Sequence, residues 1–159
     1  MQLWRLCRKP FAKKPLSGAG GLYASGRWHT APRLVVYASE SLALAGLEVL
    51  VHVDPDLGPP DLVAIALDVP AMVQGAELTL SDLPRSWRRY PAPLSLQKLG
   101  NQWLDNREDA VLCVPSAIVP SEHNFLINPL HPHTQQISVV AKTPFVLDPR
   151  LISRGRAEG

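Results

Sequence analysis

The residue best suited to chemistry in this 159-residue sequence is a carboxylate inside an apolar segment. Glu48 is the only charged residue among positions 41–53, and a buried carboxylate stays ionised only beside a cation or hydrogen-bond donors. A second interpretation is equally compatible with the pattern, namely a narrow solvent-facing stripe on an otherwise buried helix. That stripe would consist of Ser41, Ala45, Glu48 and His52. The pattern alone leaves both interpretations open.

Two arginines that precede this carboxylate could bind an anion. Arg27 lies in Gly26-Arg27-Trp28-His29, after a loop rich in glycine and serine. Its guanidinium could bind a phosphate through two hydrogen bonds while Trp28 packs behind it. Without other observations we favour the simpler interpretation, a surface arginine whose stem covers a core tryptophan. Arg5, between Trp4 and Leu6, has the same two interpretations.

Two further polar residues stand at the ends of apolar runs. Tyr37 closes the run 34–38, where its ring could lie beside Glu48 as a stacking surface or belong to the core. Ser116 follows the run 111–114, and side chains at strand ends commonly reach a site. The simpler interpretation of Ser116 is an ordinary turn serine.

Several familiar sites are missing from the sequence. The segment Gly18-Ala19-Gly20-Gly21 does not complete a GxGxxG fingerprint, and neither a P-loop nor a GxSxG motif occurs. The histidines and the two cysteines, Cys7 and Cys113, lack metal-ligand spacing. We therefore expect no metal site and a reduced chain. Arg85, Arg88 and Arg89 around Trp87 are too few to indicate a nucleic-acid-binding surface, and we expect them to lie in a solvated loop.

Composition and charge limit the possible classes of protein. With 46% hydrophobic and 19% charged residues, the chain has enough apolar surface to fold. The net charge of +2 hides two blocks, because residues 1–39 hold seven bases and no acid, whereas residues 40–84 hold eight acids and no lysine or arginine. The first block is a candidate anion-binding surface. Residues 1–18 contain no apolar run of signal-peptide length, so we expect a cytoplasmic protein without a membrane span.

The elements that must position these residues are short. Ser39 is a candidate N-cap for a helix that ends near residue 52, and a serine cap precedes the apolar spacing of a second helix over 95–106. Strands are expected at 3–6, 34–38, 62–69, 76–80, 111–114, 125–127, 137–141 and 145–147. Many short strands with two helices indicate an α+β fold, here one domain over residues 1–159.

The order and spacing of these motifs resemble the RES-domain toxins of bacterial RES–Xre toxin–antitoxin modules over nearly the whole length. The arginine, glutamate and serine that name the family fall on Arg27, Glu48 and Ser116. Ser121, in the similar Val119-Pro120-Ser121, is the alternative for the serine. The matching motifs are Leu3-Trp4-Arg5-Leu6, Gly26-Arg27-Trp28, Val35-Val36-Tyr37, Leu47-Glu48-Val49-Leu50-Val51-His52, Val114-Pro115-Ser116 and Asn124-Phe125-Leu126-Ile127-Asn128-Pro129.

The resemblance implies a fold similar to mono-ADP-ribosyltransferases and cleavage of the nicotinamide–ribose bond of NAD+, by hydrolysis or phosphorolysis, until growth stops. NAD+ would be the substrate, and no separate cofactor is implied. Glu48 would stabilise the ribosyl cation, while Tyr37 would stack on the nicotinamide or ribose. Arg27 and Arg5 would hold the diphosphate, Ser116 would position the ribose or Glu48, and Asn124 would also contact NAD+.

The resemblance further implies a cognate Xre-type antitoxin that occludes the site, with DNA contacted only through that antitoxin. Two other functions stay open. The first is transfer of ADP-ribose from NAD+ to a protein or another acceptor at the same site. The second is a non-enzymatic toxin directed at nucleic acid through its basic residues, for which binding would depend strongly on salt.

Overall fold

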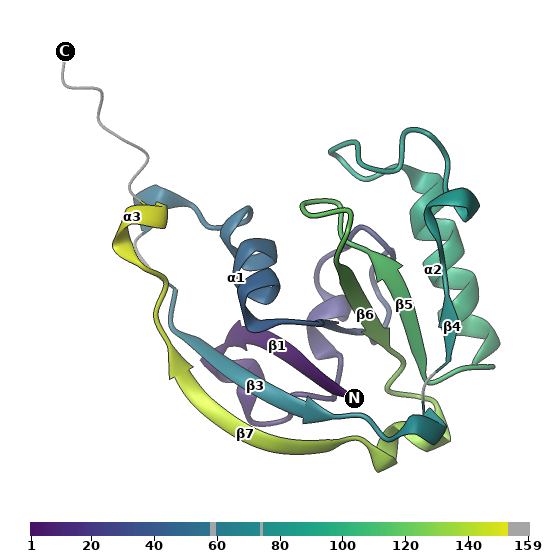
Figure 1. Cartoon of the computed structure of the whole chain (residues 1–159), viewed down its shortest axis with the longest axis horizontal. Coiled ribbons are helices and arrows are strands. Elements are labelled where there is room, and N and C mark those ends of the chain that lie inside the picture. Colours follow the sequence, from purple (N-terminus) through teal and green to yellow (C-terminus); the bar gives the residue numbers. More distant parts are fainter. Residues whose placement is uncertain (58–59, 74, 153–159) are drawn as a thin grey trace.

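One mixed sheet of seven strands organises the chain, in the order β4-β5-β6-β2-β1-β3-β7 (Figure 1). The computed structural model describes residues 1–57, 60–73 and 75–152. The strands are β1 (Gln2–Arg8), β2 (Val36–Ser39), β3 (Leu62–Asp68), β4 (Ala76–Glu77), β5 (Val111–Pro115), β6 (His123–Ile127) and β7 (Ser138–Phe145). Three α-helices accompany the sheet in the described residues: α1 (Leu42–Leu50), α2 (Leu94–Asn106) and α3 (Pro149–Ile152). The predicted α+β fold is confirmed.

The sheet is weakly joined at its centre. β1 pairs with β3 along all seven of its residues, whereas its ladder with β2 consists of the single pair Trp4 and Ser39. Because so little pairing holds them together, the two halves of the sheet diverge at this point. Figure 1 shows α1 above β1, between the β3 and β7 side and the β5 and β6 side. Glu48 is therefore carried on the helix that lies at the opening of the sheet.

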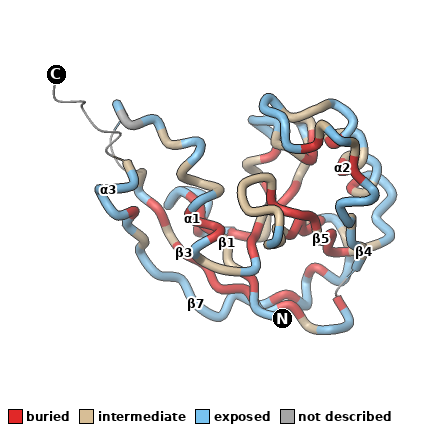
Figure 2. The backbone as a smooth tube through the Cα atoms, turned by 45° about the horizontal axis from the view of Figure 1, so that its top comes forward, coloured by how far each residue is buried: buried red, intermediate tan, exposed pale blue. Residues whose placement is uncertain are grey.

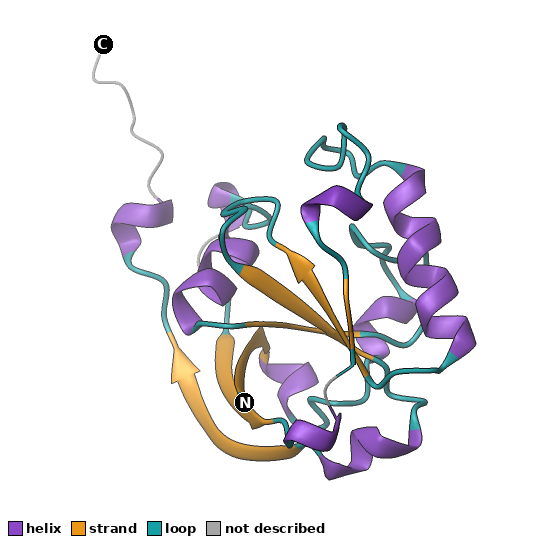
Figure 3. Cartoon of the chain, turned by 45° about the vertical axis from the view of Figure 1, so that its right-hand side comes forward, coloured by secondary structure: helices purple, strands orange, loops and turns teal. Residues whose placement is uncertain are grey.

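Three apolar clusters stabilise this arrangement. One contains buried residues of β1, β2, β3 and β6, the second lies between α2 and the other face of β5 and β6, and the third lies beneath α1. Figure 2 shows the buried backbone concentrated in the sheet, and Figure 3 shows α2 running beside its β4 end. Gly100 on α2 is required by this packing, because a Cβ there would overlap the Trp28 backbone carbonyl. The helix thus holds the loop that carries Arg27.

Both predicted helices are present, but both predicted caps are wrong. Ser39 is the last residue of β2, where it pairs with Asn124 of β6, so its backbone is still extended. The N-cap of α1 is Ser41, whose Oγ accepts a hydrogen bond from the Leu44 amide at 3.1 Å. The N-cap of α2 is Pro93, without a side-chain cap. Continued strand pairing therefore displaced the first cap by two residues.

The predicted strands differ most at the two edges of the sheet. The two runs expected at 137–141 and 145–147 form parts of one strand and the turn after it, because β7 continues through Pro144. An edge strand tolerates proline, since one side of its backbone is unpaired. The run expected at 76–80 pairs only at Ala76–Glu77 and then becomes a 3-10 turn closed by a capping box between Thr79 and Asp82.

Two smaller expectations concern the whole chain. Both cysteines, Cys7 and Cys113, are free. Among the described residues, no helix has the length and apolar character needed to cross a membrane. One domain over the full 1–159 stays a prediction, because residues 153–159 lie outside the described part.

Candidate functional site

A cavity of about 780 Å³ opens beside α1 and gathers most of the predicted site residues. β1 and β2 form its floor, α1 one wall, and the segments around Arg27 and Arg88 another. Five of the six predicted residues line it: Arg5, Arg27, Tyr37, Glu48 and Asn124. The sixth, Ser116, is fully buried behind the wall and reaches the cavity through Glu48. Residues up to 119 positions apart in the sequence thus meet in one place.

Glu48 is held by two side chains from separate strands. Ser116 Oγ donates a hydrogen bond to Glu48 Oε1 at 2.8 Å, and Asn124 Nδ2 donates a second to the same oxygen. Ser116 Oγ is itself oriented, because it accepts hydrogen bonds from the amides of Ile118 and Val119, each at 3.1 Å. Its single proton is therefore directed at the carboxylate. Both contacts engage Oε1, so the second carboxylate oxygen can face a substrate.

Ser39 orients the asparagine, a role that the sequence did not reveal. Ser39 is only 3% exposed, and its hydroxyl donates a hydrogen bond to Asn124 Oδ1 at 2.7 Å. An amide that accepts at Oδ1 presents Nδ2 on its other side, and Nδ2 faces Glu48. The only sequence signal was a serine at the end of an apolar run, which fits an N-cap equally well. The antiparallel pairing of Ser39 with Asn124 brings them together.

The solvent-stripe interpretation of α1 is wrong. Ala45 is 4% exposed and packs in the cluster beneath the helix, and Glu48 is only half-exposed. The exposed positions are Ala43, Leu47, Val51 and His52, of which only His52 belongs to the predicted stripe. The helix is therefore rotated so that Glu48, one turn after the buried Ala45, points into the cavity and not to bulk solvent.

Tyr37 is fixed against the glycine-rich loop by His29. Its hydroxyl lies 2.8 Å from His29 Nδ1, and His29 Nε2 lies 3.0 Å from the carbonyl of Ala24. A carbonyl only accepts, so Nε2 carries the proton and Nδ1 accepts from the tyrosine. Burial lowers the pKa of His29 and raises the pKa of Tyr37, so both groups stay neutral. Gly26 permits this approach, since a Cβ there would lie 2.7 Å from the Tyr37 hydroxyl.

Arg27 is anchored by backbone carbonyls of the Pro84 to Pro93 connection. Its NH1 donates to the carbonyl of Trp87 at 2.7 Å and to that of Arg89 at 3.0 Å. Burial lowers its pKa, an effect that the charge of Glu48 opposes, yet an arginine remains protonated. Trp28 packs behind it in the core at 2% exposed. Anchoring through NH1 leaves the rest of the guanidinium directed at the cavity that it lines.

Arg5 supplies a second, partly buried positive charge. Its NH1 donates to the carbonyl of Tyr37 at 3.1 Å, which ties β1 to β2 beyond their one-residue ladder. Its Nε is buried and has no hydrogen-bond partner among the described residues. Burial lowers the pKa of this guanidinium. A buried, incompletely bonded cation is costly, so an anion in the cavity would be favoured.

Three other residues at the site escaped the sequence analysis: His29, Arg88 and Gln97. Gln97 of α2 donates to the carbonyl of Gly26 at 2.9 Å and so fixes the loop. Arg88 lines the cavity, and its Nε donates to the carbonyl of Ala117 at 2.9 Å. The arginine-rich connection, expected as a solvated loop, is thus partly a wall of the cavity. Ser121 is exposed, whereas Ser116 contacts Glu48.

Comparisons with known proteins agree with one another. The family model described as "RES domain" matches residues 2–148. The protein "Toxin Res" of Pseudomonas putida KT2440 is 42% identical over 153 residues, covering 95% of this chain and 99% of the relative. The "Prs ADP-ribosylating toxin" of Sphingobium sp. YBL2 is 36% identical over 155 residues, covering 95% and 96%.

A solved structure supports the fold. The chain matches a chain in the crystal structure of the M. tuberculosis MbcT–MbcA toxin–antitoxin complex with a TM-score of 0.71, covering 96% of this chain and 86% of that one. The identity is 16%, so this likeness concerns the fold alone. The family model and the curated relatives establish that the chain belongs to the RES-domain family of toxins.

Proposed function

We propose that this RES-domain toxin cleaves the nicotinamide–ribose bond of NAD+ and arrests growth by depleting it. The observation that carries the proposal is Glu48, fixed by Ser116 and Asn124 at the wall of a cavity that also holds the cations Arg5 and Arg27. A dinucleotide with an anionic diphosphate and a positively charged nicotinamide matches such a combination of charges.

Cleavage of NAD+ requires a negative charge beside the ribose, and it does not require a general acid. The nicotinamide of NAD+ already carries a positive charge, so it leaves as a neutral molecule without being protonated. The difficulty is the oxocarbenium-like cation that forms on the ribose. Glu48 is already oriented by its two hydrogen-bond donors. It therefore stabilises that positive charge as it develops, and no free energy is spent on reorienting the carboxylate.

The cations and the aromatic ring bind the substrate. Arg27, held by two carbonyls, and Arg5, which also lines the cavity, contact the diphosphate. The ring of Tyr37 lines the same cavity and stacks on the nicotinamide or the ribose. Asn124 and Ser116 act through Glu48, which they keep in one orientation. Water or inorganic phosphate then attacks the exposed face of the ribosyl cation.

The test is incubation of the purified protein with NAD+, with and without inorganic phosphate. The products nicotinamide, ADP-ribose and the phosphorylated ADP-ribose are separated by chromatography. ADP-ribose in both reactions identifies hydrolysis, whereas a phosphorylated product that needs added phosphate identifies phosphorolysis. Stable NAD+ in both reactions contradicts the proposal.

Transfer of ADP-ribose to a protein is the second candidate. The observation that favours it is the printed name of the 36% identical relative, "Prs ADP-ribosylating toxin". The same cation at the same carbon would then be captured by a nucleophile of the acceptor. NAD+ labelled in its adenosine half distinguishes the two, because transfer leaves label covalently bound to a protein and hydrolysis leaves it in free ADP-ribose.

We also propose a cognate antitoxin, of the Xre type that the resemblance implies, which covers the cavity. The supporting observation is that the matching solved structure is a toxin–antitoxin complex. An NAD+-consuming enzyme in the cytoplasm requires such restraint. Contact with DNA would then pass through the antitoxin. Co-purification followed by loss of NAD+ cleavage in the complex would support this pairing, and full activity in the complex would contradict occlusion.

A further inference from the structure

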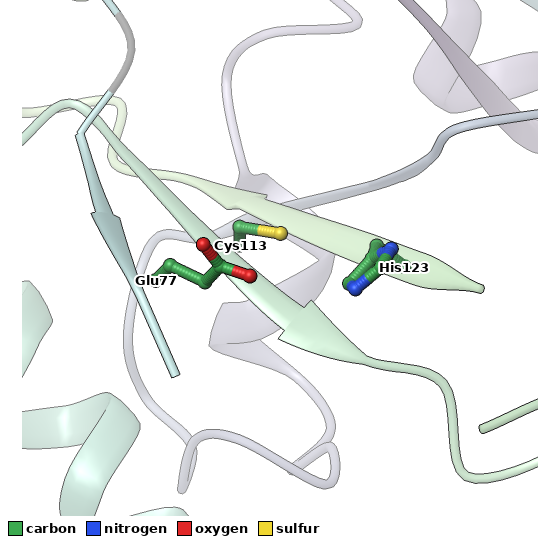
Figure 4. Close-up of side chains that lie close together, drawn as sticks. All are labelled: Glu77, Cys113 and His123. Atoms are coloured by element: carbon green, nitrogen blue, oxygen red, sulfur yellow. The ribbon is translucent and has the colours of Figure 1, made fainter. Parts of the chain in front are cut away.

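Glu77, Cys113 and His123, carried on β4, β5 and β6, lie close together (Figure 4). Their donor atoms, a carboxylate oxygen, a thiol sulfur and an imidazole nitrogen, lie within 4.8 Å of one another. Glu77 is exposed, and the other two are partly buried. The cluster is therefore accessible from solvent. No role in the proposed reaction has been assigned to any of these three residues.

Strand register explains why the sequence did not reveal this cluster. Glu77 of β4 is directly opposite Cys113 of β5, and His123 of β6 pairs with Pro115, two residues along β5 on the same face. Each strand contributes one ligand, so no short spacing such as CxxC appears. Along β6, successive side chains alternate between faces. His123 therefore faces away from Asn124, which contacts Glu48.

We propose that Glu77, Cys113 and His123 bind a divalent transition-metal ion, Zn²⁺ by preference. Thiolate, imidazole and carboxylate are the three ligand types of zinc in proteins, with bonds of about 2.0–2.3 Å. Two donor atoms of one tetrahedral ion are then roughly 3.5 Å apart. The 4.8 Å limit of the cluster thus leaves only small side-chain rotations to bring all three onto one ion. Water completes the coordination.

Glu40 supports this site from the turn between β2 and α1. Its Oε2 lies 3.1 Å from Nδ1 of His123. When Nδ1 donates to this carboxylate, Nε2 carries the lone pair that a metal needs. Carboxylates that orient a metal-bound histidine in this way are the usual second partners of zinc sites. The Glu40 amide also bonds to the His123 carbonyl at 3.1 Å, which fixes the two backbones together.

The electrostatics favour a cation. The carboxylate of Glu77 lies beside Cys113 and His123, and that of Glu40 contacts His123, so the cluster is locally negative. A divalent ion stabilises the thiolate that binds it, so binding releases the thiol proton to solvent.

The experiment uses the full-length protein, freed of any affinity tag and of metal by a chelator. Titration with Co²⁺ is followed by absorption, and Zn²⁺ binding is followed by calorimetry. We expect one ion per chain and a thiolate-to-cobalt charge-transfer band in the near ultraviolet. Saturable binding without that band would overturn the proposal, because Cys113 would not be a ligand. This measurement on the unmutated protein needs no variant to fold.

Variants then locate the site. We expect Cys113→Ser and His123→Ala to weaken Zn²⁺ binding at least tenfold and Glu40→Gln to weaken it about 10- to 100-fold. His133→Ala removes an exposed histidine outside the cluster and should bind Zn²⁺ as the unmutated protein does. Cys7 is retained in every variant. Unchanged affinity in a folded Cys113→Ser/His123→Ala double variant, checked by circular dichroism, would overturn the proposal.

Discussion

Ser116 donates its hydroxyl hydrogen bond to Glu48 across 2.8 Å, although 68 positions separate them in the sequence. Ser116 is fully buried and lies directly after β5, whereas Glu48 lies on α1. A buried hydroxyl with a single acceptor fixes the direction of the carboxylate. Ser116 and Glu48 therefore form one hydrogen-bonded unit in this chain.

Ser116→Ala should lower kcat for NAD+ cleavage by roughly 10- to 100-fold, the value of one hydrogen bond to a charged group. Ser121→Ala is the matched control, because Ser121 follows a similar Val-Pro pair but is exposed. We expect it to retain activity. Loss of activity in Ser121→Ala with none in Ser116→Ala would transfer the role of the family serine to Ser121. Initial rates of nicotinamide release give the comparison.

Ser39→Ala should lower kcat by several-fold while KM changes little, because Ser39 only orients the Asn124 amide that contacts Glu48. Ser39→Thr keeps the hydroxyl and should restore much of the lost rate. A merely structural role predicts instead that both variants lose thermal stability and that the rate follows the folded fraction. Steady-state kinetics and thermal denaturation of the two variants distinguish these cases.

Arg27→Ala should chiefly raise KM for NAD+, by about 10- to 100-fold, if the guanidinium binds the diphosphate. Arg27→Lys should recover little, because an ammonium group cannot hold the Trp87 and Arg89 carbonyls and also reach a phosphate. Arg33→Ala, which removes a partly exposed ion pair with Asp105 and two hydrogen bonds to Thr30 outside the cavity lining, is the control. An unchanged KM with a lower kcat would contradict a role in diphosphate binding and would mean that Arg27 stabilises the transition state.

His29 should make stability depend on pH. Burial lowers its pKa below the usual 6.5, so below pH 6.5 the unfolded chain takes up a proton that the folded chain resists. The free energy of unfolding should therefore fall as pH falls from 6.5 toward the lowered pKa, and then level off.

His29→Asn should remove this part of the pH dependence, because the amide can still accept from Tyr37 and does not titrate. Denaturant unfolding between pH 7.5 and pH 5 measures the effect, and the exposed His133→Ala serves as the control. The same slope in His29→Asn as in the unmutated protein would show that another group is responsible.

The fold class and the interior strands could be predicted from the sequence, because β-branched apolar runs such as 62–69 leave few alternatives. The bounds of the elements at the edges of the sheet could not be predicted. The strands expected at 137–141 and 145–147 left a gap that contains Pro144, yet β7 continues through this proline, since edge pairing does not require its missing amide proton. Ser39 had the residue type of an N-cap, yet long-range pairing with Asn124 kept it in β2.

The site residues that belong to sequence motifs could be predicted. The resemblance singled out Arg27, Tyr37, Glu48 and Ser116, and the structure gathers them around one cavity. The residues that orient them, such as His29 and Gln97, carry no such signal, because their partners depend on tertiary packing. The Glu77 cluster was missed for the same reason, since strand register and not spacing assembles it.

The most direct test of the account is NAD+ consumption by Glu48→Gln, which keeps the size and shape of the side chain but removes its charge. We predict a rate at least about 100-fold lower than that of the unmutated protein, as for loss of one preorganised charge-stabilising group. Glu108→Gln, at an exposed position outside the cavity, should act at the full rate. NAD+ consumption by Glu48→Gln at the unmutated rate would contradict the central claim.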